Sequence, residues 1–406
     1  MNYDMLFIGV DVSKQKHDVA LMNEHKTCVQ HPFVIRENRA GFSSLVDRLA
    51  SLKATYHTKS FNIGMEATGD YWKNLFHFLS RFSDYIPVVI NPVKTRAFAK
   101  TELRRAKTDA VNAKDIALFL VEKRTPKSYY RAPVFDNIKD MDTQVQAFNK
   151  QLTMTTNRLR IELGKVAPEI EQSVRNIRSK QLLALLMHFP TAAAITQASL
   201  PELSAIRFGN KKRRILPAFF LKLQELSQES IAYKSEIGVG AVVQSLVRTI
   251  LHFQMEVESL KRNMTQLYEH TTSNNAAFLS SVKGISNDTA IVLDAYFGDL
   301  QRFNNAKQFV AFFGMNPVIN QSGNQTNRNS YLEKKGSAAV RRKLFYITLT
   351  LIREQVEPFS SFYKRLIVKG KPKLVAIGAT MRKLLGIMFQ MIVNQQKFDP
   401  DRYKNS

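Results

Sequence analysis

The sequence predicts an α/β domain at its N-terminal end, joined to a longer part that is almost entirely helical. Over about the first 125 residues, short apolar runs bounded by polar turns alternate with segments of helical periodicity. From residue 126 to 275 glycine is scarce and helical periodicity continues, and residues 276–406 are mostly helical and rich in basic side chains. We therefore expect three domains, 1–125, 126–275 and 276–406, the middle one a helical, coiled-coil-like region suited to dimerisation.

Five apolar runs in the first domain have the length of β-strands. The first, Leu6–Val10, is apolar apart from Gly9 and has the pattern of a buried strand. Short polar links join it to the next two runs, as in an antiparallel meander. The other four expected strands are Asp18–Met22, Phe33–Ile35, Phe61–Met65 and Ile86–Ile90.

Helical segments separate the later strands. The expected helices cover about residues 41–52, 71–82, 92–100 and 108–122. Together with the strands they give the order βββαβαβα, which is that of an RNase H-like domain. In α/β sheets ligands bind at the carboxyl ends of strands, so acidic side chains at those ends are the first candidates for a functional site.

Two acids stand at such positions, and a third lies on the last helix of the domain. Asp11 follows the first strand, Glu66 ends the fourth, and Asp109 lies near the start of the last helix. Each has an ordinary alternative: a turn aspartate, an acid at a helix start, or an acid favoured by the helix dipole. Their order within one α/β domain favours a joint role, because clustered carboxylates repel one another unless a divalent cation lies between them. Oxygen ligands suit Mg²⁺, and one or two ions would serve phosphoryl-transfer chemistry.

A fourth acid would be expected one helical turn after Asp109, but the residue there is Asn112. An amide oxygen can bind a metal, although it carries no charge and cannot act as a base. Asp115, one turn further, could substitute for it, or the site could be impaired. We expect Asn112 to complete a set of metal ligands with Asp11, Glu66 and Asp109.

Charge is the strongest signal in the composition. The 406 residues include 59 Lys and Arg against 34 Asp and Glu, a formal net charge of +25. Such an excess suits a polyanion, and we expect nucleic acid rather than a membrane surface, because the sequence has no lipidation motif. No apolar run reaches the ~18 residues of a membrane helix, and no signal peptide is expected. Cys28 stands alone, which excludes an intrachain disulfide and fits a reducing cytoplasm.

The C-terminal domain has the features of a nucleic-acid-binding surface. Leu279–Tyr296 has the pattern of a helix–hairpin–helix, with Lys283–Gly284–Ile285 as the hairpin and a plain helical turn as the alternative. Residues 331–390 hold 13 Lys and Arg against 3 acids. A basic run at 211–214, KKRR, is either a solvated face or a phosphate contact. The candidate nucleic-acid contacts are Lys14, Arg104, Arg105, Lys107, Lys283, Arg328, Lys334, Lys335, Arg341, Arg342 and Lys343.

Several longer motifs follow one another in a fixed order. The N-terminal ones are GVDVSKQKHDVAL, GMEATGDYW, NPVKTRAFA and RRAKTDAVNAKDIA. The C-terminal ones include LSSVKGISNDTAIVLDAYFGDLQRF, NPVINQSGN and KKGSAAVRRKLFYITLTLI. Together these stretches, within residues 5–125 and 276–395, resemble the DEDD transposases of the insertion-sequence one-ten family, which are relatives of the Piv-type DNA invertases.

The resemblance implies a RuvC-like domain that binds Mg²⁺ through Asp11, Glu66, Asp109 and the position of Asn112, where this sequence departs from the family. It also implies a serine that attacks DNA and becomes covalently linked to it. That serine falls on Ser322, in NPVINQSGN. Because a serine hydroxyl is a poor nucleophile without activation, we hypothesise that the acids and Ser322 form one composite centre.

The same resemblance implies partners. Recombination acts on donor and target DNA, and its several cuts imply a dimer or tetramer. A structured guide RNA would pair with both DNAs and read their sequence in place of protein contacts.

Three other functions fit parts of the sequence. A sugar-kinase or actin-like ATPase also has an Asp after its first strand, but it needs a glycine-rich phosphate loop, which Val12–Ser13–Lys14 does not provide. A RuvC-like resolvase would hydrolyse DNA without a covalent intermediate and would leave the C-terminal domain unexplained. A catalytically weakened DNA- or RNA-binding relative is suggested by Asn112 alone. Magnesium-dependent cleavage with a covalent protein–DNA product separates the recombinase from all three.

Overall fold

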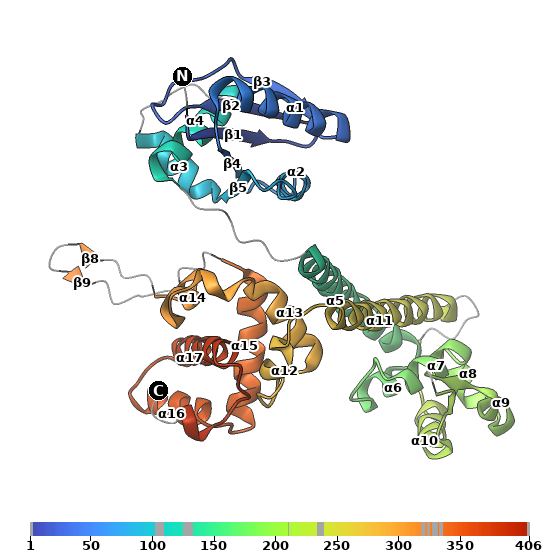
Figure 1. Cartoon of the computed structure of the whole chain (residues 1–406). Helices are drawn as coiled ribbons and strands as arrows, with labels where there is room; N and C mark the ends of the chain where they lie inside the picture. Colours follow the sequence, from blue (N-terminus) through green and yellow to red (C-terminus); the bar gives the residue numbers. More distant parts are fainter. Residues whose placement is uncertain are drawn as a thin grey trace. The chain divides into compact units, whose positions relative to one another are not determined.

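The computed structural model divides into two compact units, residues 1–130 and 131–406 (Figure 1). The structure describes residues 3–101, 109–124, 133–209, 211–233, 239–317, 321–322, 325–326, 332 and 336–403. The side chains of Asp109 and Ser322 lie outside the described set, although both residues are placed in the backbone. Each unit is described by itself below.

The first unit is built on a mixed sheet of five strands within its described residues. The strands are β1 (Met5–Val12), β2 (Lys16–Met22), β3 (Phe33–Arg36), β4 (Ser60–Glu66) and β5 (Tyr85–Ile90). Their order across the sheet is β3-β2-β1-β4-β5, with β1, β2 and β3 antiparallel and with β4 and β5 parallel to β1. This confirms the predicted α/β unit and its meander, and it is consistent with an RNase H-like domain.

Helices cover both faces of this sheet because its strands alternate apolar side chains on two sides. The helices are α1 (Arg39–Tyr56), α2 (Trp72–Leu79), α3 (Pro92–Thr101) and α4 (Asp109–Lys123). One core joins Ile8 and Ile63 of the sheet to α1 and α2. The other joins Phe7 and Val88 to α3 and α4.

Two long helices, α5 (Pro133–Val166) and α11 (Val239–Glu269), lie side by side at the start of the second unit (Figure 1). They are antiparallel, since one core joins Phe135 to Tyr268 and another joins Leu159 to Val247. Helical periodicity was expected to continue over residues 126–275, but residues 229–233 are not helical. Helix α10 ends at Gln228, and Glu169 then accepts hydrogen bonds from Ser230 and from the backbone of Ile231, which turns the chain away.

A cluster of short helices, residues 168–228, connects these long helices. Its elements are α6 (Pro168–Ser173), α7 (Lys180–His188), α8 (Ala192–Gln197), α9 (Leu200–Ala205), β6 (Arg207–Phe208), β7 (Arg213–Arg214) and α10 (Pro217–Gln228). Prolines at the first positions of α6 and α10 suit helix starts, where a backbone N–H has no helical partner. The small β6–β7 hairpin was not predicted, because strands of two residues leave no periodic signal.

The remaining helices surround one core that also includes Phe135 and Tyr268, so packing runs across residue 275. The elements are α12 (Asn275–Leu279), α13 (Asn287–Phe297), η1 (Leu300–Arg302), α14 (Ala306–Phe312), β8 (Gln321–Ser322), β9 (Gln325–Thr326), α15 (Ala338–Arg353), α16 (Phe359–Val368), α17 (Lys373–Val393) and η2 (Asp401–Tyr403). Among the described helices, α17 alone is long and apolar enough to cross a membrane, but 67% of its apolar window is buried. It is the central helix of this core.

Candidate active site

Asp11 and Glu66 occupy matching positions on neighbouring parallel strands. Gly9 of β1 pairs with Gly64 of β4, and each acid lies two residues further along its strand. Side chains two residues apart point to the same face of a sheet, so both acids lie on the face covered by α4. Both are half-buried at the carboxyl ends of their strands, which is where ligands collect in α/β sheets. The structure therefore brings these two predicted residues to one edge.

Gly9 sets the approach of α4 to the sheet. A β-carbon there would lie 1.9 Å from the carbonyl oxygen of Ala113 and 2.4 Å from the nitrogen of Ala117, so no side chain fits between strand and helix. At Gly64 a β-carbon would lie 2.8 Å from Leu120. Two adjacent glycines thus let the α4 backbone lie against β1 and β4. The preceding turn of α4 reaches Asp11.

Asn112 lies in that turn and contacts Asp11 directly. Its Nδ2 donates a hydrogen bond to Asp11 Oδ2 at 3.0 Å. The amide oxygen of Asn112 is the group that would bind a cation. A rotation of the side-chain amide exchanges the positions of its oxygen and nitrogen, so the oxygen can also point towards Asp11. The fold therefore brings the side chain of Asn112 into contact with Asp11.

Glu66 is held in place by two hydroxyl groups. Thr95 Oγ1 donates to Glu66 Oε2 at 2.9 Å, and Thr68 Oγ1 donates to Glu66 Oε1 at 3.2 Å. Neutral donors satisfy one lone pair of each oxygen and leave others open. A carboxylate oriented in this way suits a cation ligand, and Thr95, on α3, is a positioning residue that the sequence did not reveal.

Asp18 is a further acid at this edge that the sequence analysis missed. It lies directly opposite Asp11 in the β1–β2 register, so both project from the same face. Its side chain is 13% exposed, and Lys16 Nζ lies 4.0 Å from its carboxylate. Like charges directly opposite each other destabilise a strand pair unless a cation compensates. Counting residues back from the Ser13–Gln15 turn could have revealed this pairing.

The turn after Asp11 is anchored from the other face of the sheet by His17. The ring is fully buried; Nδ1 accepts from the Ser13 backbone N–H at 3.3 Å, and Nε2 bonds Glu37. Glu37 also accepts from Asn74 at 2.8 Å, which ties the turn to α2. Because Nδ1 accepts, the ring carries its proton on Nε2. The Asp11 backbone is consequently fixed on both sides of the strand.

The donor set fits Mg²⁺ as far as it is described. Asp11, Glu66 and the Asn112 amide offer only oxygen ligands, which is the set that hard divalent cations prefer. No group of three His, Cys, Asp or Glu side chains suited to a metal occurs among the described residues. Asp109 begins α4, one turn before Asn112, and its side chain lies outside that set. Asp115 is half-buried one turn after Asn112.

Some predicted contacts lie outside the described residues. They are Arg104, Arg105, Lys107, Arg328, Lys334 and Lys335. In the first unit, Lys14 is exposed in the turn after Asp11. In the second unit, the candidate nucleophile Ser322 lies in β8, paired with Gln325 of β9.

A hollow in the second unit is lined by two of the predicted nucleic-acid contacts, Arg342 and Lys343. It has a volume of about 260 Å³ and lies between α15 and the turn before α13, lined among others by Gly284, Arg342 and Tyr346. Gly284 has a φ of +92°, and a β-carbon there would lie 2.9 Å from Thr350, so both conformation and space favour glycine. Lys283 is next to it, 3.8 Å from Glu354. This cationic hollow suits a phosphate.

Two other predicted contacts are engaged within the second unit. Lys343 donates to the buried Asp142 at 2.8 Å, with 15% of its side chain exposed, and so joins α15 to α5. Arg341 donates to the carbonyl oxygens of Phe313 and Gly336 at 3.2 and 2.9 Å, and burial lowers the pKa of its guanidinium. Arg342 remains the most accessible of the three and contacts Gln146.

Two family models match the chain. That of the IS110-type DEDD transposases covers residues 8–168, and that of the IS116/IS110/IS902 transposase family covers residues 276–364. The chain belongs to the IS110 family of transposases. The first match includes Asp11, Glu66, Asp109 and Asn112, and the second includes Ser322.

Individual relatives agree with this family membership. A pilin gene-inverting protein of Moraxella lacunata is 24% identical over 395 residues, 97% of each chain. A protein of insertion element IS110 from Streptomyces coelicolor is 24% identical over 298 residues, 71% of each chain. A third, of insertion element IS116 from Streptomyces clavuligerus, is 21% identical over 245 residues. Transposases and gene-inverting proteins imply that DNA is the substrate of this IS110-family chain, in keeping with its charge of +25.

Proposed function

We propose that this protein is a Mg²⁺-dependent DNA transposase and site-specific recombinase that uses Ser322 as its nucleophile. The observation that carries the proposal is the convergence of Asp11, Glu66 and Asn112 at one sheet edge, with Asn112 bonded to Asp11 at 3.0 Å. That edge is oxygen-rich and held by glycine-mediated packing. Membership of a transposase family supports DNA as substrate.

Asp11, Glu66, Asp109 and Asn112 would hold the metal, with Asp115 as a possible replacement for Asn112. Bound there, Mg²⁺ would polarise a phosphate and favour ionisation of a nearby hydroxyl. Asp18 adds negative charge opposite Asp11 and so supports cation binding where Asn112 supplies none. Thr95 and Thr68 orient Glu66, while the His17–Glu37 pair fixes the Asp11 turn.

Ser322 attacks the phosphorus of the scissile phosphodiester. An Oγ–P bond forms, the bond from phosphorus to the leaving sugar oxygen breaks, and the serine proton ends on that oxygen as a free hydroxyl. The phosphoserine link conserves the bond energy, so attack by a hydroxyl of another DNA end reverses the step and joins new strands. The acids and Ser322 would act as one composite centre.

Further parts of the proposal concern the assembly. Donor and target DNA must be held together, so a dimer or tetramer is expected, and the antiparallel α5–α11 pair offers an extended helical surface for it. A guide RNA that pairs with both DNAs would supply sequence specificity by base pairing. The nearest alternatives are a hydrolytic resolvase without covalent intermediate and a DNA-binding relative weakened at Asn112.

A trapping assay tests the proposal. Supercoiled DNA carrying the element junction is incubated with Mg²⁺ and protein, with and without flanking RNA, and protein attached covalently to a DNA end is measured. The wild-type adduct should be lost in both Ser322→Ala and Asp11→Ala. Ser51→Ala, on the exposed face of α1, removes a serine hydroxyl elsewhere and should leave the adduct unchanged.

Two other outcomes would redirect the assignment. Cleavage without adduct would indicate a hydrolytic resolvase. Tight binding with neither cleavage nor adduct would indicate that the neutral Asn112 has cost the site its chemistry.

A further inference from the structure

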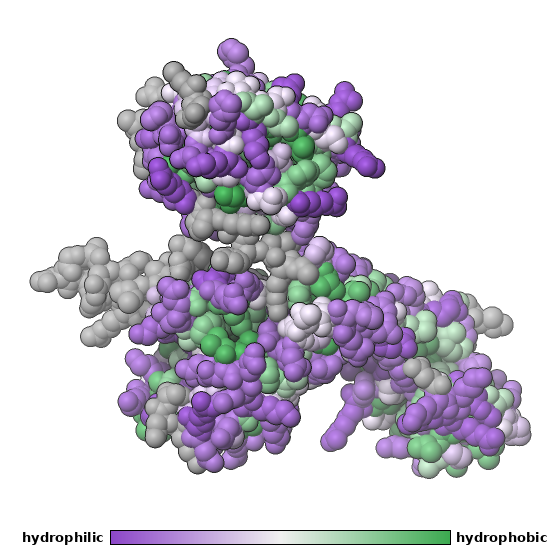
Figure 2. All heavy atoms as spheres, in the orientation of Figure 1, coloured by the Kyte–Doolittle hydropathy of each residue, from purple (hydrophilic) through white to green (hydrophobic). Residues whose placement is uncertain are grey.

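The β6–β7 hairpin is the most basic short segment among the described residues of the second unit's short-helix cluster. Residues 207–214 read RFGNKKRR, five cations without an acid. Lys211, Lys212, Arg213 and Arg214 are all exposed, and none of them forms an ion pair with an acid among the described residues. Most of the visible surface of this cluster is hydrophilic (Figure 2). The hairpin therefore presents uncompensated positive charge to solvent.

The pairing of the two strands brings positive charges of the hairpin close to each other. Arg207 lies opposite Arg214, and Phe208 lies opposite Arg213. Like charges directly opposite each other destabilise a strand pair when nothing compensates them. Arg207 is partly engaged, since its guanidinium donates to the carbonyl of Ile206 at 3.1 Å. A hairpin with this charge pattern is best accounted for by a polyanionic partner that neutralises it.

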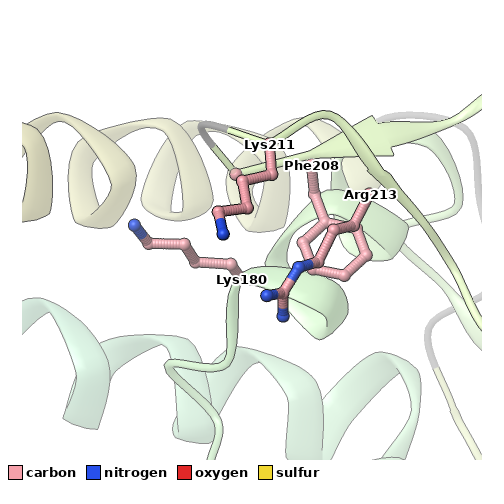
Figure 3. A pocket seen from close by; sticks show the side chains of 5 residues that line it. Lys180, Phe208, Lys211 and Arg213 are labelled. Atoms are coloured by element: carbon pink, nitrogen blue, oxygen red, sulfur yellow. The ribbon is translucent and has the colours of Figure 1, made fainter.

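A hollow of about 260 Å³ lies beside the hairpin (Figure 3). Lys180, at the start of α7, lines it together with Phe208, Gly209, Lys211 and Arg213. Lys180 donates to Glu258 at 2.8 Å, so α11 fixes its position and partly offsets its charge. Two further cations and a half-buried aromatic ring remain around the space, which is the chemistry that receives a phosphodiester group and its sugar.

We propose that the β6–β7 hairpin is a second DNA-binding element that contacts the backbone of duplex DNA. A two-stranded β-ribbon is one of the two elements that the major groove of B-form DNA admits, whereas the major groove of an RNA helix is too deep and narrow for side chains to read. The hairpin is short and cationic, so its contacts are to phosphates and do not depend on sequence. The inference rests on the proposed function in taking DNA as the substrate.

The test compares two charge-matched double variants of the full chain. Lys211→Gln with Arg213→Gln removes two hairpin cations, and Lys222→Gln with Arg248→Gln removes two exposed cations from α10 and α11. Affinity for a random-sequence duplex is measured in EDTA, so that no Mg²⁺-dependent cleavage occurs. The salt concentration is varied from about 50 to about 200 mM, a range over which phosphate contacts change the affinity strongly. Thermal unfolding checks that each variant is folded.

The hairpin variant should bind the duplex roughly tenfold more weakly, with a salt slope shallower by up to about 2, since each phosphate contact contributes about 0.9. The α10–α11 variant should bind as the wild type does, and Lys211→Arg with Arg213→Lys should retain binding. Equal losses in both double variants, or none in the hairpin variant, would overturn the inference. A loss confined to an RNA stem of the same length would overturn the assignment to duplex DNA.

The adduct assay on the same variants separates this inference from the proposed function. If the wild type forms the phosphoserine adduct while the hairpin variant binds normally, the hairpin inference alone fails. If the wild type forms no adduct but its duplex binding depends on the hairpin, the proposed chemistry fails and the inference stands.

Discussion

Asn112 sets the charge balance of the proposed metal site. Its amide donates to Asp11, so in the absence of a cation the pair is stable where two carboxylates would repel each other. An asparagine in place of a fourth acid also removes one negative charge from the proposed ligand set, and cation affinity depends on that charge. In the proposed site, a neutral fourth position therefore lowers metal affinity and stabilises the metal-free protein.

Replacing this residue tests the balance. Asn112→Asp should lower the melting temperature in EDTA, because two carboxylates then face each other, and should increase the gain in melting temperature on adding Mg²⁺. We expect Mg²⁺ to bind about tenfold more tightly to this variant than to the wild type. Thermal unfolding across a Mg²⁺ titration measures both effects.

Asn112→Ala is the matched control, since it removes the hydrogen bond without adding charge. It should lower the melting temperature slightly and weaken the response to Mg²⁺. Equal responses of Asp and Ala variants to Mg²⁺ would show that position 112 does not face a bound cation.

At the residue scale, the sequence predicted which acids follow a strand. It missed the contacts that depend on how strands pair and on how helices fold back onto the sheet. Asp11 and Glu66 follow apolar strands, and strand ends can be located from composition. Asp18 is opposite Asp11 only in one hairpin register, and Thr95 reaches Glu66 only because α3 folds back. Lys343 looked like a surface cation but pairs with buried Asp142, on a helix 201 positions away in sequence.

Among the elements, α4 contributes most to the proposed active site. Its contact with β1 depends on Gly9, where even a methyl group would overlap the backbone of Ala113. Because that backbone belongs to the helix that carries Asp109 and Asn112, any shift of α4 moves two of the proposed ligands together.

Gly9→Ala should therefore destabilise the first unit by about 3 kcal/mol, the upper part of the usual range for overpacking. It should also reduce adduct formation, because α4 is displaced from Asp11. Urea unfolding followed by circular dichroism measures the first effect. Gly164→Ala, on the exposed face of α5 with nothing within 4 Å of the added carbon, is the matched control and should stabilise by about 0.5–1 kcal/mol. A Gly9→Ala variant that is as stable as the wild type would contradict the close approach of α4 to β1.

Element types were predicted well where periodicity was long and poorly where it was short. The strand at 86–90 begins one residue earlier, at Tyr85, and the helix expected over 71–82 covers Trp72–Leu79. The β6–β7 hairpin was missed because its strands have two residues each, held by long-range packing of the surrounding helices. Tertiary context of that kind is not encoded in local patterns.

At the scale of the whole molecule, the two units have separate cores. Among the described residues, the cores around β1 contain only residues before 130, and those around α5, α11 and α17 contain only residues after 131. Buried apolar surface is the dominant source of stability, so units with no shared core are expected to unfold independently.

Calorimetry of the full chain should consequently resolve two unfolding transitions. Gly9→Ala should lower only one of them, and Leu385→Ala, which empties part of the fully buried core around α17, should lower only the other, by about 2–5 kcal/mol. Adding Mg²⁺ should raise the transition that Gly9→Ala lowers, since the proposed ligands all belong to the first unit. A single transition shifted by both substitutions would show that the units are energetically coupled.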